Sequence, residues 1–231
     1  MSGSPTRHAC ALCGAACRPP FRAPQPEIAP DLDMRPGEPA RSTLRDWVQV
    51  CRTCSAAAPD LGTLPEAARA IVGSDAYRAL TTAVSEETLP FRRWALICEG
   101  LGDQAKAAEA WLQAAWAAED AAAMADAAAA RARVADLWDG TAHTETALRR
   151  LDVLRRSAAF EAAAAWADEL RRRQLDETAA AIVAFQQTRI SRRDTGRHLI
   201  SSALPPPSHA PHVSHGKRTA PGFWGRLLRR A

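Results

Sequence analysis

Long apolar runs are missing from this chain of 231 residues. Charged residues interrupt every alanine-rich stretch, so no segment reaches the roughly 18 continuous apolar residues that a membrane span requires. The first residues, Met1-Ser-Gly-Ser-Pro, also lack the apolar core of a secretion signal. We therefore expect a cytoplasmic protein with no transmembrane segment.

Catalytic motifs are scarce as well. The chain contains no glycine-rich phosphate-binding loop, no HExxH and no GxSxG. Four of its six histidines lie near the two ends. The adjacent carboxylates Glu86-Glu87 and Glu119-Asp120 are of the kind that any acidic helix surface carries. We therefore expect no catalytic residues and a protein that is not an enzyme.

Lysine is almost absent, since Lys106 and Lys217 are the only two, and arginine carries nearly all the positive charge. That charge is unevenly spread. Residues 61–186 hold 14 basic and 19 acidic side chains, a net charge of −5, whereas residues 187–231 hold nine basic side chains against Asp194 alone. An acidic middle argues against a nucleic-acid groove there, so attraction to polyanions is expected only in the C-terminal part.

Two cysteine pairs of identical spacing, Cys10-Ala-Leu-Cys13 and Cys51-Arg-Thr-Cys54, are the strongest signal in the chain. Each pair can place two sulfurs on one side of a tight turn, and two such turns can surround one Zn²⁺ tetrahedrally. Gly14 favours the first turn because glycine relieves the backbone there. Four thiolates leave no open position for water, so we expect a structural zinc site with ligands Cys10, Cys13, Cys51 and Cys54.

Other readings of the cysteines stay open. Cys17 and His8 lie near enough in sequence to replace a ligand, for example in a register that uses Cys13 and Cys17. A redox role for the two dithiols is a further alternative, although such a motif normally belongs to a βαβ unit that is not predicted here. Cys98 falls on the apolar face of a predicted helix, which favours a buried small hydrophobe.

The composition divides the chain into three parts. Residues 1–60 form a small zinc-ribbon-like module with a proline-rich insertion between the cysteine pairs, which excludes a long helix there and favours an extended excursion. Asp46–Val50 alternates and is rich in β-formers, so it predicts a strand that leads to Cys51. Residues 61–199 form an α-helical domain, and residues 200–231 a flexible basic tail.

Helical periodicity recurs throughout the middle part. Asp103 and Asp176 are expected to cap two of the helices. Five tryptophans are expected to act as packing anchors between helices. Those tryptophans are Trp94, Trp111, Trp116, Trp138 and Trp166. Four predicted helices start near Pro65, Ser74, Pro90 and Asp103, and a separate alanine-rich helix follows and runs to about Trp138. Three more cover Leu148–Leu154, Phe160–Leu170 and Asp176–Ile190.

Two helix pairs follow one plan. Ala95–Asp103 leads through a glycine turn into Ala107–Trp111, and Leu151–Phe160 leads into Ala162–Trp166, with small residues near each crossing. Both resemble the antiparallel helical hairpins of tetratricopeptide (TPR) repeats, although a regular period of 34 residues is missing. The sequence therefore predicts a mainly α fold with TPR-like helical hairpins.

The order of these features resembles a group of uncharacterised bacterial proteins in which two CxxC zinc knuckles precede a TPR-like helical domain. The resemblance rests on Cys10–Gly14, Trp47–Cys54, Phe91–Trp94 and Ala110–Trp116. In that group the second knuckle continues with glycine and an aromatic residue, whereas Ser55-Ala-Ala follows here. The resemblance implies zinc binding and a helical-repeat domain, and it implies no activity.

The C-terminal part carries three further patterns. His209, His212 and His215 recur every third residue, which would align them in a polyproline helix as a weak metal trap, although chance spacing in a polar tail explains them better. Phe223–Arg230 is aromatic and basic, and would suit an anionic membrane surface or a partner groove. The third is a cluster of arginines at the end of the last helix that could meet phosphates. Its members are Arg189, Arg192, Arg193 and Arg197.

These observations favour an adaptor that binds a protein partner through its helical domain, with Zn²⁺ as a structural cofactor. The alternative is a nucleic-acid-binding protein that uses the zinc module and the basic tail. The sequence does not specify the partner, the pathway or the oligomeric state.

Overall fold

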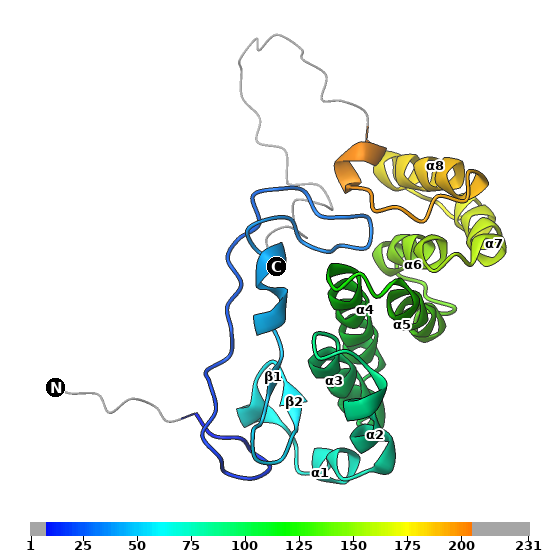
Figure 1. Ribbon diagram of the computed structural model, residues 1–231. Coiled ribbons are helices and arrows are strands. Elements are labelled where there is room, and N and C mark those ends of the chain that lie inside the picture. Colours follow the sequence, from blue (N-terminus) through cyan, green and yellow to red (C-terminus); the bar gives the residue numbers. More distant parts are fainter. Residues whose placement is uncertain (1–7, 205–231) are drawn as a thin grey trace.

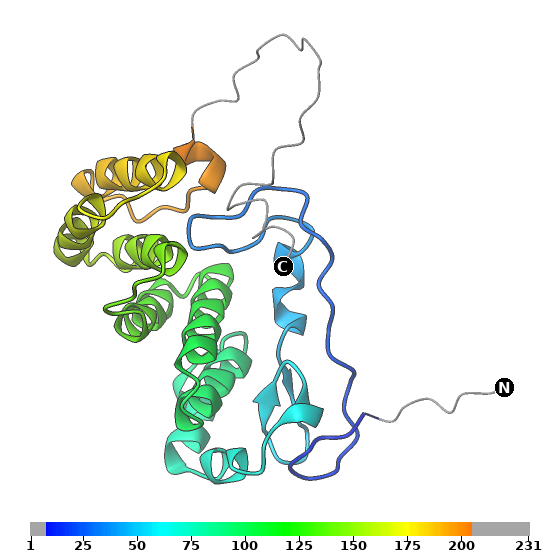
Figure 2. The same ribbon diagram turned by 180° about the vertical axis from the view of Figure 1, so that it is seen from behind.

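The computed structural model describes residues 8–204 and is mainly helical, with a four-cysteine cluster near the N-terminus, which confirms the predicted fold class. Figure 1 shows the helices stepping upward as a curved array, while the N-terminal segment runs along one side of it. Figure 2 shows the same arrangement from behind. The α-helices are α1 Ala68–Val72, α2 Asp75–Ala83, α3 Leu89–Gly100, α4 Gln104–Asp120, α5 Met124–Leu137, α6 Thr144–Arg156, α7 Phe160–Arg171 and α8 Glu177–Ser191.

Local sequence signals set where several helices begin and end. The Asp103 carboxylate accepts the backbone N–H of Lys106 at 3.0 Å, and Asp176 accepts that of Ala179 at 2.7 Å, so both predicted N-caps are confirmed. Gly102, at φ +78°, lies in the tight turn between α3 and α4, where a left-handed backbone favours glycine.

The helices pack in chain order. From α3 to α8, each helix contacts the next one in the chain. In addition, α6 contacts α8. Alanines fill most of the α3–α4–α5 interfaces, and Ala108, Ala115 and Ala130 are almost completely buried. Small side chains let the helix axes approach closely, so the alanine-rich composition becomes a packing feature of the array.

The predicted strand over Asp46–Val50 is wrong for its first three residues. A 3₁₀ helix, η1, occupies Arg41–Asp46, and Trp47 continues the helical bonding by donating its backbone N–H to Leu44 at 3.0 Å. The Trp47 indole N–H also bonds the Thr43 hydroxyl at 3.0 Å, which holds the ring over η1. The strand β1 is therefore only Gln49–Val50, and it pairs antiparallel with β2, Ala57–Ala58.

The proline-rich excursion does run in an extended path, and it ends in a loop against the helical array (Figure 1). We call residues 31–35 the inserted loop. Asp31 donates its backbone N–H to the Arg35 carbonyl at 2.9 Å, which closes the loop. Leu32 at its tip joins the same hydrophobic core as Leu112 and Leu151 of the helices.

Two hydrophobic clusters hold the structure together, and each draws on both sides of residue 60, where we expected a domain boundary. The larger cluster unites Leu44 and Val48 with α3 to α8, and the smaller one unites the knuckles with Leu61, Tyr77 and Ile97. The N-terminal module is therefore packed onto the helices along its length.

The end of the described chain also contacts the inserted loop. Leu32 donates its N–H to His198 O at 3.0 Å, and Ile200 donates to Pro30 O at 2.9 Å. A 3₁₀ helix, η3, follows at Ile200–Ala203, and Ile200 is buried, so packed structure continues past the boundary expected at residue 199. From residue 205 on, the expected tail lies outside the described residues. Between residues 8 and 204, no helix combines the length and the apolar character needed to cross a bilayer.

Candidate metal centre

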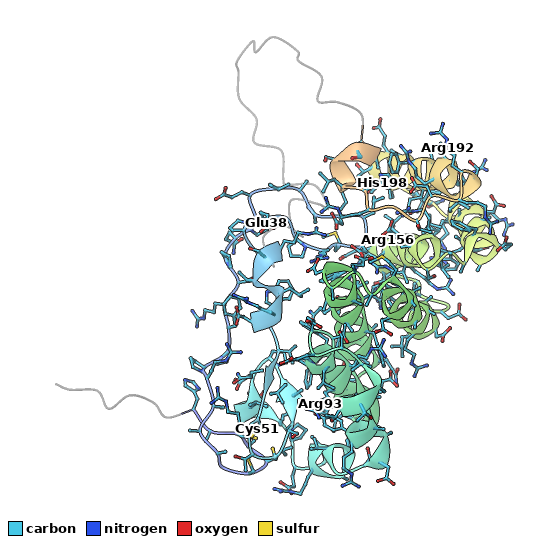
Figure 3. All side chains as sticks on the ribbon, viewed as in Figure 1. Glu38, Cys51, Arg93, Arg156, Arg192 and His198 are labelled. Atoms are coloured by element: carbon cyan, nitrogen blue, oxygen red, sulfur yellow. The ribbon has the colours of Figure 1, made fainter. Side chains whose placement is uncertain are left out.

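The four predicted ligands meet at one point. The Sγ atoms of Cys10, Cys13, Cys51 and Cys54 all lie within 4.8 Å of one another, with Cys10 to Cys54 at 3.7 Å and Cys13 to Cys51 at 3.5 Å. Figure 3 labels Cys51 at the end of the molecule that carries this cluster. Sulfurs bound tetrahedrally to zinc at about 2.3 Å lie about 3.7 Å apart, so the spacing fits one such ion.

Both cysteine pairs adopt the same backbone turn. The carbonyl of Cys10 accepts the N–H of Gly14 at 2.8 Å, and the carbonyl of Cys51 accepts the N–H of Ser55 at 2.9 Å. Each first cysteine also donates its own N–H back across the turn, to Ala15 and Ala56 respectively. The two knuckles are therefore equivalent, as their identical sequence spacing predicts.

The residue after each knuckle has a left-handed backbone, at φ +74° for Gly14 and φ +63° for Ser55. Serine is strained there and glycine is not. We expect Ser55→Gly to raise the free energy of unfolding by about 0.5 kcal/mol and Gly14→Ala to lower it by about 1 kcal/mol. Urea denaturation of the two variants measures both effects. A Cβ at Gly14 would meet no atom within 4 Å, so its effect isolates the backbone, and equal signs for the two variants would contradict the account.

Helices α1 and α2 hold the two knuckles in place. The Arg69 guanidinium donates to the Leu12 carbonyl in the first knuckle at 2.6 Å, and the Tyr77 hydroxyl donates to the Ser55 carbonyl at the second at 2.9 Å. The first knuckle is tied to the segment after the second by Ala11 N–H to Leu61 O at 2.9 Å. Outer bonds of this kind fix the directions of metal ligands.

The thiols of Cys10, Cys51 and Cys54 differ in pKa. Burial opposes ionisation of Cys51, but the backbone N–H groups of Cys54 and Thr53 outweigh it and lower the Cys51 pKa to about 7. Burial and the neighbouring sulfurs raise the pKa of Cys54 to about 12, and burial also raises the pKa of Cys10. A full set of thiolates therefore needs a cation among them, and soft sulfur ligands in a tetrahedral array favour Zn²⁺.

The alternative ligands lie beside the cluster. Cys17 is half-buried, and His8, which is exposed, accepts the Cys17 backbone N–H at its carbonyl, at 2.9 Å. Neither belongs to the group of ligand atoms that lie within 4.8 Å of one another. Cys98 is buried in α3, where burial raises its thiol pKa to about 12, as suits a small core residue.

A buried ion network at the inserted loop was not predicted. Asp33 is fully buried, and its Oδ2 accepts from Arg131 at 2.8 Å, from Trp116 Nε1 at 2.9 Å and from Arg156 at 3.0 Å. One carboxylate thus joins α4, α5 and α6, and Figure 3 labels Arg156 where the loop meets α6. Burial alone would raise the Asp33 pKa, but the arginines hold it far below its usual range.

Further charges complete this network. Glu119 lies 2.7 Å from both Arg131 and Arg156, and Arg35 forms an ion pair with Asp120. The sequence did contain a signal for it. Arg131 occupies the same helical stripe as the buried Ala127, Val134 and Trp138, a position where an unpaired charge would be costly. A charged residue within an apolar stripe indicates a buried partner.

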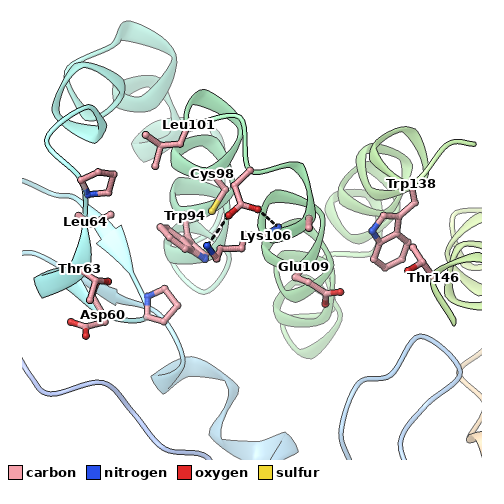
Figure 4. A pocket seen from close by; sticks show the side chains of 14 residues that line it. Asp60, Thr63, Leu64, Trp94, Cys98, Leu101, Lys106, Glu109, Trp138 and Thr146 are labelled. Carbon is pink, nitrogen blue, oxygen red and sulfur yellow. Dashed lines mark hydrogen bonds and ion pairs between the residues drawn. The ribbon is translucent and has the colours of Figure 1, made fainter. Parts of the chain in front are cut away.

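Two pockets adjoin between the N-terminal segment and the helices. The first, of about 800 Å³, lies between the segment after the second knuckle and α3 and α4, and the second, of about 590 Å³, lies between the proline-rich excursion and α4 and α6. Pro59 and Glu109 line both, so we call the pair the Pro59–Glu109 groove. Figure 4 shows the first pocket, with Trp94 and Trp138 on either side of Glu109.

The predicted phosphate-binding arginines are mostly engaged within the protein. Arg193 stacks on Phe160 at 4.6 Å and pairs with Glu161 at 3.4 Å, and Arg189 stacks on Phe185 at 4.6 Å. The Arg197 guanidinium lies 3.9 Å from the Asp31 carboxylate. Arg192 is exposed just after α8, and the side chains of Arg193 and Arg197 are 68% and 50% exposed.

Comparison with protein-family models, with curated proteins and with solved structures finds no match. The resemblance to bacterial proteins with two zinc knuckles therefore stays a prediction, as do its TPR-like repeats. The four-cysteine cluster that could hold a metal ion stands on the geometry of this chain alone.

Proposed function

We propose that this protein is a non-enzymatic, cytoplasmic adaptor that holds a structural Zn²⁺ and binds an extended segment of a protein partner in the Pro59–Glu109 groove. The metal closes the two knuckles into one unit. The helical array supplies one wall of the groove, and the metal-bound module supplies the other. The observation that carries the proposal is the groove itself.

The lining of the groove suits a peptide. Aromatic rings and prolines from both walls give it an apolar floor, with Trp94 and Trp138 in the first pocket and Trp47 and Trp116 in the second. Carboxylate and cationic side chains also line the groove between these apolar residues. Broad aromatic surfaces with a few polar groups are typical of sites that bind extended chains.

The inserted loop supports the same idea, because the array already holds one extended segment of its own chain. Arg149 donates from Nε to the Asp33 carbonyl at 3.2 Å and pairs with both Glu109 oxygens at 2.6 and 2.7 Å. The surface of the helical array that the inserted loop covers is therefore closed to a partner. The groove beside it is lined by the same Arg149 and Glu109.

A cytoplasmic location is part of the proposal. All six cysteines are free, and a thiolate metal site persists where the surroundings are reducing.

Site-specific photocross-linking in the source cell tests the proposal. A photoreactive residue placed at Ala105 or Thr146, which both line the first pocket, is expected to capture a discrete set of proteins. The matched control is the same residue at Met124, which is 57% exposed and lines neither pocket of the groove. Identical products from all three positions, or none from the groove positions, would contradict the adaptor function.

Nucleic-acid binding stays the alternative prediction. Its discriminating measurement is retention on nucleic acid across a salt series, because phosphate contacts weaken steeply as salt rises. Within residues 8–204, the exposed Arg192, Arg193 and Arg197 would supply part of the positive charge, and the C-terminal residues would supply the rest.

A further inference from the structure

The C-terminal segment Phe223–Arg230 combines aromatic rings with positive charge. It carries two aromatic rings, two leucines and three arginines within eight residues. Residues 205–231 contain five basic side chains and no acidic one. The metal centre and the ion network described above are built from residues 8–204.

The Pro59–Glu109 groove is complementary in charge and surface. Four carboxylates, Asp60, Asp103, Glu109 and Glu145, line it against the two cations Lys106 and Arg149, which leaves a balance of −2. Both cations already have a carboxylate partner, Asp103 for Lys106 and Glu109 for Arg149. A basic segment would therefore meet uncompensated negative charge at the groove and aromatic rings at its floor.

The chain is long enough to reach the groove. The described part of the chain ends just after η3, and Ile200 of η3 donates its backbone N–H to the Pro30 carbonyl. Pro30 belongs to the proline-rich excursion, which also lines the second pocket. Residues 205–222 separate this point from Phe223, and 18 residues span at most about 60 Å. Helix α4, which runs along the groove, has 17 residues and is about 25 Å long.

We propose that Phe223–Arg230 docks in the Pro59–Glu109 groove of its own chain and competes there with the partner segment. This inference rests on the proposed function, since it takes the groove as a peptide-binding surface. It makes the adaptor self-regulated, because a partner must displace the C-terminal segment. The arginines face the carboxylates of the groove, and Phe223 and Trp224 lie against its aromatic rings.

The scarcity of lysine gives a direct test. Lys106 is on the groove and Lys217 is six residues before Phe223, and these are the only lysines in the chain. A short amine-reactive cross-linker applied to the full-length, metal-loaded protein is expected to join Lys106 to Lys217 within one chain. Mass spectrometry of the monomer band identifies the link. Replacing Phe223, Trp224 and the three arginines by serine is expected to reduce its yield at least about fivefold.

The control keeps both lysines and the tether. His209, His212 and His215 replaced together by serine should leave the yield unchanged, since these residues are not in the docking motif. A yield that is equal in all three proteins, or no link at all, would overturn the inference. Links between isotopically distinct chains in a mixture would also overturn it, by making a second copy the occupant. Photocross-linking from Ala105 tests the adaptor function separately, and partner capture without the lysine link would remove only the self-docking.

Discussion

Asp33→Asn is expected to lower the free energy of unfolding by about 3–5 kcal/mol. The substitution hardly changes the shape of the side chain, but it puts a neutral amide in place of the fully buried carboxylate and leaves the guanidinium groups of Arg131 and Arg156 to share Glu119 alone as a carboxylate within 3 Å. A buried charge that loses its partner is costly because no water can replace the lost interaction. Equilibrium urea denaturation of the metal-loaded protein measures the change.

The control is Asp46→Asn, in the same N-terminal part of the chain. Asp46 pairs with Arg18 at 3.2 Å, and the Arg18 side chain is 57% exposed, so its loss should cost less than about 1 kcal/mol. Similar losses for the two variants would show that the Asp33 network does not tie the loop to the helices.

The pH dependence of unfolding, compared between the parent protein and the Asp33→Asn variant, gives a second readout. The Asp33 pKa is lowered in the folded state, so its contribution to stability is complete above the ordinary carboxyl pKa of about 4. It is lost as the pH falls below that value and Asp33 becomes protonated. Stability of the parent protein should therefore fall more steeply below pH 4 than stability of the Asp33→Asn variant.

Cys51→Ser is expected to abolish stoichiometric metal binding and to open the knuckles. Structural zinc sites with cysteine ligands bind with about 10–16 kcal/mol, so losing one thiolate removes a large share of the energy that orders the module. Hydrogen exchange is expected to become fast at the knuckle amides of Gly14 and Ser55, which bond to the Cys10 and Cys51 carbonyls. Exchange in α6 to α8 should change much less, because those helices lie in the other hydrophobic cluster.

Cys17→Ser provides the matched control, since it also removes a thiol near the centre. It should keep the metal and the protection of both knuckles. Metal loss in Cys17→Ser would assign the ligands of the first knuckle differently, in the Cys13 and Cys17 register that the sequence left open, and metal retention in Cys51→Ser would contradict the site altogether.

The helices and the four-cysteine cluster were predictable because their signals are local. Asp103 and Asp176 cap helices through residues three positions away, and each CxxC pair forms its own turn. Equal spacing in both pairs was enough to predict that the four sulfurs converge. The start of the strand was misplaced because η1 includes Asp46, and because the backbone and indole N–H groups of Trp47 bond back to Leu44 and Thr43.

The ion network and the groove were not predictable in the same way. Asp33 bonds to residues 83 to 123 positions away on three helices, and no local pattern in a proline-rich segment specifies such partners. Arg131 within its apolar stripe indicated that a buried partner exists, but not where it comes from. The groove arises between two segments that meet only when the metal module packs on α3 and α4, so its lining is a property of the tertiary structure.

Native mass spectrometry of freshly purified, full-length protein, combined with thiol titration before and after chelation, tests the metal centre most directly. The account predicts one zinc ion per chain, with the thiols of Cys10, Cys13, Cys51 and Cys54 unreactive until a chelator removes it. A chain that carries no stoichiometric metal while those four thiols react freely would contradict it.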